Sequence, residues 1–268
     1  MSRISDTFNT LSLKKETALV GFVTAGDPDI ETSQRIVAAM CDNGVDILEL
    51  GIPFSDPTAD GPVIQRSSTR ALKHRVCVKD VLEMSGKLRK HSTVPIILFS
   101  YYNPIMAYGP TDFYKDALSA GTDGLLAVDL PSEEAGELIG QWNPDEFSFI
   151  RLVAPTTGHE RMQQISANAS GFLYLVSTTG VTGSGGIDTT EIRAHADTLR
   201  SVTSLPICVG FGISTPEDVA TISAFAEGVV IGSAFERIIE ENLENPDLPE
   251  IIGRQTAAFK AATKRGAD

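Results

Sequence analysis

Cysteine, long apolar runs and positive charge are all scarce in this sequence of 268 residues. Its three cysteines, Cys41, Cys77 and Cys208, are widely spaced, so neither a disulfide framework nor a zinc site is indicated. No apolar run approaches the roughly 18 residues that a membrane span needs, and the first residues lack the apolar centre of a secretory signal. We therefore expect a cytoplasmic protein.

The balance of charge is strongly acidic, with 22 Lys plus Arg, 35 Asp plus Glu and a formal net charge of −13 at pH 7. Nucleic acids and anionic membranes are bound by clustered basic residues, so neither is expected as the main partner. A small phosphorylated substrate is compatible with this acidity, because backbone amides at a helix N-terminus can hold a phosphate without lysine.

Short apolar runs alternate with helical patterns along the chain. Its hydrophobic share of 42% is typical of a globular protein. Eight short runs are apolar enough to be strands buried on both faces, namely residues 18–24, 46–50, 94–100, 123–128, 147–152, 171–177, 206–209 and 228–231. Eight helical patterns follow them in turn, at residues 28–43, 78–91, 111–120, 132–142, 160–168, 189–202, 215–224 and 249–264.

This alternation predicts the fold class. Strand and helix in strict alternation imply parallel strands with right-handed crossovers, and eight units close a barrel. We predict an α/β protein with one domain over residues 1–268, a (β/α)8 TIM barrel. A doubly wound open sheet is the alternative.

Four additional segments lie outside the eight repeating units. Residues 1–12 predict an N-terminal helix, from the spacing of Ile4, Phe8 and Leu11, that packs on one mouth of the barrel. Residues 53–74 predict a loop with an extra helix, and a short helix is expected to start at Ser233 after the last strand. Residues 178–190, which are rich in glycine and small polar side chains, are expected to form a mobile lid, and a disordered linker between elements is the alternative.

Two carboxylates follow the second predicted strand. Glu49 lies between Leu48 and Leu50, where desolvation would raise its pKa toward the range in which it can exchange a proton near neutrality. An ion pair inside the barrel is the structural alternative for Glu49, and a turn is the alternative for Asp60-Gly61. Two carboxylates in different surroundings titrate apart, so one can carry a proton while the other stays ionised.

Glycines and hydroxyls mark the ends of the last two predicted strands. Gly212 follows the seventh strand, and Gly232 with Ser233 follows the eighth. In barrels a phosphate is commonly held by these two loops and the N-terminus of a short extra helix. The pair therefore indicates a phosphate site, although tight turns alone could also require these glycines.

Three aromatic residues, Phe22, Tyr101 and Tyr174, fall at or near strand ends on the same mouth. They could enclose a flat aromatic substrate, or they could be part of the core. The four histidines have no partner at helical spacing, so we assign none to a metal or to catalysis. The acidic stretch 236–250 is interpreted as a solvated surface.

Several motifs together resemble the tryptophan synthase alpha subunit family. They are LELGIPFSDP at 48–57, ADGP at 59–62, YNP at 102–104, GVTG at 180–183 and GFGIS at 210–214. The likeness runs in order from Arg3 to the carboxyl terminus. The sequence departs from the family in one place. Many members have a basic residue within a few positions after the glycine that Gly183 matches, whereas the next basic residue here is Arg193.

The resemblance implies a function and roles for named residues. The family cleaves indole-3-glycerol phosphate to indole and glyceraldehyde 3-phosphate in tryptophan biosynthesis, without a metal or cofactor in this subunit. Glu49 would be the proton shuttle, and Asp60 would accept the indole N–H. Phe22, Tyr101 and Tyr174 match aromatic residues around the substrate, and Thr182 matches a lid residue that meets Asp60. The residues that match positions around the phosphate are Gly183, Gly212, Gly232 and Ser233.

The resemblance also implies a partner. The family works as an α2β2 heterotetramer with a beta subunit that carries pyridoxal phosphate, and the loops 53–60 and 179–187 would face it. Two other functions stay open from the sequence: a sugar-phosphate isomerase on the same barrel, and a catalytically silent subunit that activates a beta partner.

Overall fold

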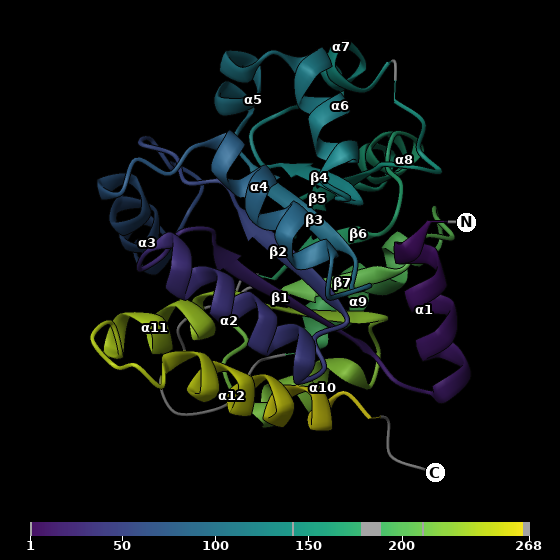
Figure 1. Ribbon diagram of the computed structural model, residues 1–268. Coiled ribbons are helices and arrows are strands. Elements are labelled where there is room, and N and C mark those ends of the chain that lie inside the picture. The colour runs from purple at the N-terminus through teal and green to yellow at the C-terminus, as the bar shows by residue number, and fades with distance from the viewer. Residues whose placement is uncertain (1, 141, 178–188, 211, 265–268) are drawn as a thin grey trace.

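A closed barrel of parallel strands forms the centre of the molecule, and helices surround it (Figure 1). The computed structural model describes residues 2–140, 142–177, 189–210 and 212–264. The strands pair in chain order and β8 returns to β1. Their bounds are β1 (Ala18–Thr24), β2 (Ile47–Gly51), β3 (Ile96–Ser100), β4 (Gly124–Ala127), β5 (Ser148–Val153), β6 (Leu173–Val176), β7 (Ile207–Gly210) and β8 (Gly228–Ile231). The predicted barrel is confirmed, and the open sheet is excluded.

Helices connect successive strands and cover the outside of the barrel (Figure 1). They are α1 (Arg3–Lys14), α2 (Ile30–Asp42), α3 (Pro62–Lys73), α4 (Val78–Arg89), α5 (Tyr102–Tyr108), α6 (Pro110–Ser119), α7 (Ala135–Ile139), α8 (His159–Ala167), α9 (Thr189–Arg200), α10 (Pro216–Ser223), α11 (Ser233–Glu241) and α12 (Leu248–Ala262). The helix α12 packs against α2, which brings the last helix beside the first crossover.

The N-terminal helix closes one end of the barrel, as predicted. Ile4, Phe8 and Leu11 are buried in the same apolar cluster as the inward-facing residues of the strands. Arg3 adds an ion pair of 2.8 Å to Asp123, which immediately precedes β4. Because this cluster fills the end of the barrel at which the strands begin, the opposite end is left for a ligand site.

The elements outside the repeating units agree with the prediction in two places and differ in one. The loop after β2 leads into α3, and α11 follows β8, as expected. The short helix α5 was not predicted, because Tyr102-Asn103-Pro104 has the composition of a turn. Pro104 nevertheless falls in the first helical turn, where its missing N–H has no intrahelical partner to lose.

The start of α2 also differs from the prediction. The predicted helix begins at Pro28, whereas α2 begins at Ile30 with Asp29 as its cap. The Asp29 carboxylate accepts hydrogen bonds from the backbone N–H groups of Glu31 and Thr32 at 3.0 and 2.9 Å. Asp27 is not part of the cap, because its carboxylate binds Arg70 instead.

Candidate active site

A cavity of about 430 Å³ opens at the end of the barrel opposite α1. Residues of β1, β2, β3, β6 and β8 line it, together with the loops after β2, β7 and β8 and the first half of α3 and α11. They are Phe22, Glu49, Asp60, Gly61, Pro62, Val63, Ile64, Phe99, Tyr174, Gly212, Ile213, Val230, Gly232, Ser233 and Arg237. Most of the wall is apolar, so charged groups on it are poorly screened by water.

Glu49 projects from β2 into this cavity. It pairs in the sheet with Phe22 on one side and Ile97 on the other, and its side chain is 0% exposed. Neither carboxyl oxygen has a hydrogen-bond partner among the described residues. The barrel-interior ion pair considered for Glu49 is therefore absent from this part of the chain. Burial without a partner disfavours the carboxylate form and raises the pKa of Glu49 to about 8.

Asp60 reaches the same cavity from the loop between β2 and α3. The loop is a turn at this point, because the Asp60 N–H donates to the carbonyl of Pro57 at 3.1 Å. Partial burial raises the pKa of the Asp60 carboxyl to about 6, and a hydrogen bond from the Tyr101 hydroxyl opposes that rise. At pH 7 the Asp60 carboxyl is thus mainly ionised, whereas the Glu49 carboxyl is mainly protonated.

Tyr101 forms hydrogen bonds with the loop that carries Asp60. Its hydroxyl accepts a hydrogen bond from the backbone N–H of Ala59 at 2.8 Å and donates one to Asp60. The ring is 4% exposed and packs against Phe54 with centroids 5.1 Å apart. The contact of Tyr101 with a substrate stays a prediction, while the structure shows Tyr101 bound to a carboxylate that lines the cavity.

The aromatic wall of the cavity consists of Phe22, Phe99 and Tyr174. The rings of Phe22 and Phe99 meet edge to face at 5.0 Å. Tyr174 stands directly over Gly210, where a Cβ would lie 2.3 Å from the tyrosine hydroxyl, so this position of the ring requires glycine. Phe99 was missed from sequence because it lies inside an apolar strand with no polar signal. Its alternation with Ile97 could have identified it as inward-facing.

Another part of the cavity lining has the features of an anion site. Gly212 adopts a left-handed conformation with φ of 74°, and Gly232 and Ser233 stand at the start of α11. The first N–H groups of a helix lack intrahelical acceptors and attract negative charge. Of the four residues predicted to surround a phosphate, Gly212, Gly232 and Ser233 therefore lie on one cavity, together with Glu49 and Asp60.

Arg237 is a residue of this site that the sequence interpretation missed. Among the described residues that line the cavity, it is the one with a positive charge. It lies four residues after Ser233 on α11, so both project from the same face of the helix. The interpretation of 236–250 as a solvated acidic surface obscured it, whereas the i, i+4 spacing from Ser233 could have revealed it.

That interpretation of 236–250 is also wrong for Glu236. Its side chain is 0% exposed, and one carboxyl oxygen accepts a hydrogen bond from the backbone N–H of Thr24 at 2.6 Å. The reason is its position in the first turn of α11, which faces the end of β1 rather than solvent. Glu241 and Glu244 on the same stretch are exposed, as expected.

Two predicted substrate contacts, Thr182 and Gly183, lie outside the described residues, as does most of the proposed lid at 178–190. Thr189 and Thr190, at the end of that range, form the start of α9. Within the described ranges, no group of three or more His, Cys, Asp or Glu side chains could hold a metal ion. None of the helices in the described part of the chain is long and apolar enough to cross a membrane.

Comparison with known proteins agrees with this geometry. The family model described as tryptophan synthase alpha chain matches residues 8–264. The tryptophan synthase alpha chain of Desulfosudis oleivorans is 61% identical over 264 residues, covering 98% of this chain and 100% of that protein. That of Citrifermentans bemidjiense is 45% identical over 266 residues, covering 99% of each. The crystal structure of tryptophan synthase subunit alpha from Legionella pneumophila has a TM-score of 0.91 and 40% identity over 98% of each chain. This chain belongs to the tryptophan synthase alpha chain family.

Proposed function

We propose that this chain cleaves indole-3-glycerol phosphate to indole and glyceraldehyde 3-phosphate with Glu49 and Asp60 as its working carboxylates. The alpha-chain reaction makes the protein a lyase of tryptophan biosynthesis. One observation carries the assignment of residues: two carboxyls with pKa values of about 8 and about 6 lie on one apolar cavity that ends in a glycine-rich anion site. Family membership at high identity argues against the sugar-phosphate isomerase.

The pKa of Glu49 suits a proton shuttle. At neutral pH its carboxyl holds a proton that it can deliver to C3 of the indole ring, which turns the ring into a cationic electron sink. The resulting carboxylate then accepts the proton of the substrate hydroxyl adjacent to the scissile bond. The O–H electron pair becomes the aldehyde C=O, and the electrons of the broken C–C bond restore the aromatic indole. Glu49 thus ends the cycle protonated, as it began.

Asp60 has the complementary role. Its ionised carboxylate accepts the indole N–H and stabilises the positive charge that develops when C3 is protonated. The hydrogen bond from Tyr101 fixes the carboxylate and favours its charged form. A carboxylate that was protonated at neutral pH could not provide this stabilisation, which is why the difference between the two pKa values matters.

The walls of the cavity suit the two ends of the substrate. Phe22 and Phe99 offer an apolar surface to the indole ring, while Gly212, Ser233 and the first turn of α11 face the phosphate. Tyr174 also lines the cavity and stands over Gly210. We assign Thr182 and Gly183 to the substrate on the family likeness alone.

The alpha chain implies a beta-subunit partner, and we propose an α2β2 heterotetramer in which the beta subunit carries the pyridoxal phosphate. In this proposal the loops 53–60 and 179–187 face the beta subunit. The chain itself forms one cytoplasmic domain that needs neither a cofactor nor a metal for cleavage. Indole, the apolar product, would pass to the partner.

Indole release from indole-3-glycerol phosphate tests this function directly. The purified chain is assayed alone and with a beta subunit, alongside Glu49→Gln and Asp60→Asn, with Glu241→Gln as an exposed control on α11. We expect each active-site variant to lose about 10²-fold or more of kcat, as is typical of general acid–base groups, while the control retains activity. Near-normal rates in either variant would reject its role. A wild-type chain that only stimulates the beta reaction would instead support the silent-subunit alternative.

A further inference from the structure

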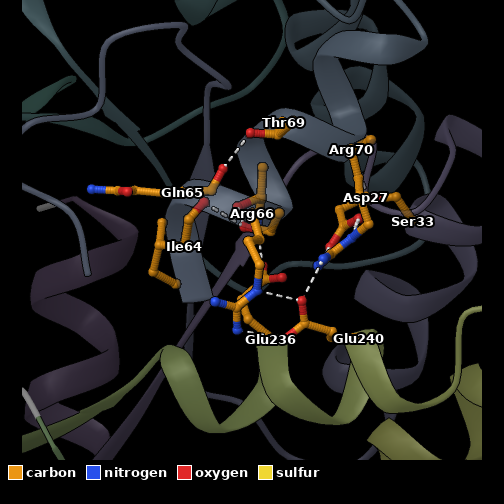
Figure 2. Close-up of polar contacts among 12 residues, drawn as sticks. Asp27, Ser33, Ile64, Gln65, Arg66, Thr69, Arg70, Glu236 and Glu240 are labelled. Atoms are coloured by element: carbon orange, nitrogen blue, oxygen red, sulfur yellow. Dashed lines mark hydrogen bonds and ion pairs between the residues drawn. The ribbon is translucent and has the colours of Figure 1, made fainter. Parts of the chain in front are cut away.

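Two acidic side chains, Asp27 and Glu236, are buried, and Figure 2 shows them among the polar side chains that surround them. Asp27 lies in the loop after β1 and is 1% exposed, and Glu236 lies in the first turn of α11 and is 0% exposed. The catalytic mechanism uses neither of them. Two buried carboxyls in contact are costly when both are ionised, so their presence together calls for an explanation.

Asp27 is the ionised member of the pair. Its two carboxyl oxygens accept hydrogen bonds from Nε and one terminal nitrogen of Arg70, both at 2.7 Å (Figure 2). This fork-to-fork geometry is the strongest form of an arginine–carboxylate ion pair and requires a charged carboxylate. Asp27 therefore carries the negative charge.

Glu236 is the neutral member. Its Oε1 accepts from the backbone N–H of Thr24 at 2.6 Å, but no donor among the described residues points at its Oε2. Its carboxyl instead meets that of Asp27, to which it can only donate. A proton on Glu236 satisfies this contact, and burial together with the charge of Asp27 holds the pKa of Glu236 well above its ordinary value.

The surrounding charges already balance without Glu236. Arg70 also donates to Glu240 at 3.0 Å, and Arg66 donates to the two oxygens of Glu240 at 2.6 and 2.7 Å (Figure 2). The two guanidinium groups of α3 thus match the two carboxylates of Asp27 and Glu240. An ionised Glu236 would add a third negative charge to the two carboxylates that these two guanidinium groups already pair.

The pair joins three elements that each contribute to the cavity. Thr24 ends β1, which carries Phe22, and its hydroxyl is 2.7 Å from that of Ser67 on α3. The helix α3 begins directly after Asp60 and Gly61. Glu236 lies one turn after Ser233, at the anion-binding end of the cavity. The contacts of Glu236 therefore set where the start of α11 stands relative to the rest of the site.

We propose that Glu236 is a positioning residue for the phosphate end of the cavity: as a neutral acid it donates to Asp27 and accepts from Thr24, and so holds the start of α11 in place. This inference rests on the proposed function for the identity of the ligand as a phosphate. It differs from a structural ion pair in requiring that Glu236 be uncharged.

Substitution at position 236 distinguishes the two possibilities, with inorganic phosphate as the probe. Glu236→Gln keeps a neutral donor and an acceptor in the same places, whereas Glu236→Ala removes both, and the exposed Glu241→Gln is the matched control. Phosphate binding is measured by calorimetry, and KM and kcat by indole release. We expect Glu236→Ala to weaken phosphate binding and raise KM by about fivefold or more, with a smaller change in kcat, because a buried N–H and a carboxylate lose their partners. Glu236→Gln should stay within about twofold of wild type at pH 7.

The pH dependence gives a readout that a merely structural role would not move. As pH rises and Glu236 ionises beside Asp27, the wild-type protein should bind phosphate more weakly relative to Glu236→Gln. The ratio of the two affinities at each pH cancels the ionisation of phosphate itself and of Glu49 and Asp60. A glutamine variant as impaired as the alanine variant, or a ratio that does not change with pH, would overturn the inference.

The calorimetric measurement also separates this inference from the proposed function, because it needs no catalysis. Phosphate binding with the expected pattern in a chain that releases no indole would sustain the positioning role and reject the reaction. If the chain releases indole but neither substitution at Glu236 changes its affinity for phosphate, the proposed reaction is sustained and the positioning role of Glu236 is rejected. If Glu236→Ala does not fold, the comparison of Glu236→Gln with wild type across pH still decides.

Discussion

Replacing Glu49 by glutamine should make this protein more stable at alkaline pH while it abolishes most of the activity. Glu49 is fully buried, and its carboxyl has no partner among the described side chains and backbone groups. Such a group is easily desolvated in its neutral form and poorly tolerated as an anion. The property that suits Glu49 for proton transfer is therefore a cost to the folded state, and a neutral isostere should remove it.

The size and sign of the effect follow from the pKa. Glu49 has a pKa of about 8 in the folded chain against an ordinary value of 4.5, so between these values the folded state holds a proton that the unfolded state has released. The free energy of unfolding of the wild-type protein then falls as pH rises through this window. At about 1.36 kcal/mol per pH unit, this group removes about 3.5 kcal/mol between pH 5 and pH 8, and Glu49→Gln should escape that loss.

Urea unfolding of both proteins at pH 5 and pH 8 measures this difference. At each pH, the free energy of unfolding of the wild type is subtracted from that of the variant. Subtracting the value at pH 5 from the value at pH 8 then cancels contributions that do not depend on pH, including the packing of the amide. The same subtraction for Glu241→Gln, an exposed carboxyl, should give a value near zero. A glutamine variant that gains no stability over wild type between the two pH values would refute the reasoning, because Glu49 would then be ionised or paired in the folded chain.

Three further predictions concern the rest of the site. The pH profile of kcat/KM should have an acid limb with a pKa near 6, from protonation of Asp60, and an alkaline limb with a pKa near 8, from ionisation of Glu49. Asp60→Asn should abolish the acid limb, and an acid limb that persists in this variant would contradict the role of Asp60. Tyr101→Phe removes a hydrogen bond to the ionised form of Asp60, so the acid limb should move to a higher pH in rate profiles, and an unmoved limb would show that Tyr101 does not act through this carboxylate. Arg237→Gln should raise KM for indole-3-glycerol phosphate by about threefold to tenfold in steady-state assays, while the exposed Arg254→Gln leaves it unchanged; equal values for both variants would remove Arg237 from the site.

The fold could be predicted from the sequence because parallel strands in a barrel are buried on both faces. Runs such as 18–24 and 228–231 are short, continuous and apolar, and their alternation with helices leaves few topologies. Helices were predicted wrongly where the local composition suggests a different structure from the one that the position in the fold imposes. The helix α5 has the composition of a turn, and α2 begins at Ile30 with Asp29 as its cap rather than at Pro28.

The candidate site was predictable where one residue contradicts its neighbours. Glu49 stands out in an apolar strand, and Gly232 with Ser233 stands out at a helix start. Arg237 and Glu236 escaped because they belong to a stretch whose composition is that of a solvated helix. Which residues of such a helix face inward depends on how α11 packs against β1 and α3, and this information comes from tertiary contacts rather than from the local pattern.

The two buried glutamates of this barrel show why burial alone does not identify a catalytic acid. Both Glu49 and Glu236 have a raised pKa, and desolvation is the first cause in each. The carboxyl of Glu236 is held by Thr24 and Asp27, so moving its proton would break contacts that fix α11. The carboxyl of Glu49 has no such contacts within the described structure and faces the cavity, so its proton can move to a substrate without breaking a protein hydrogen bond. A donor introduced beside Glu49 should therefore lower its pKa, stabilise the fold and slow the reaction together, because all three depend on the same unmade hydrogen bonds.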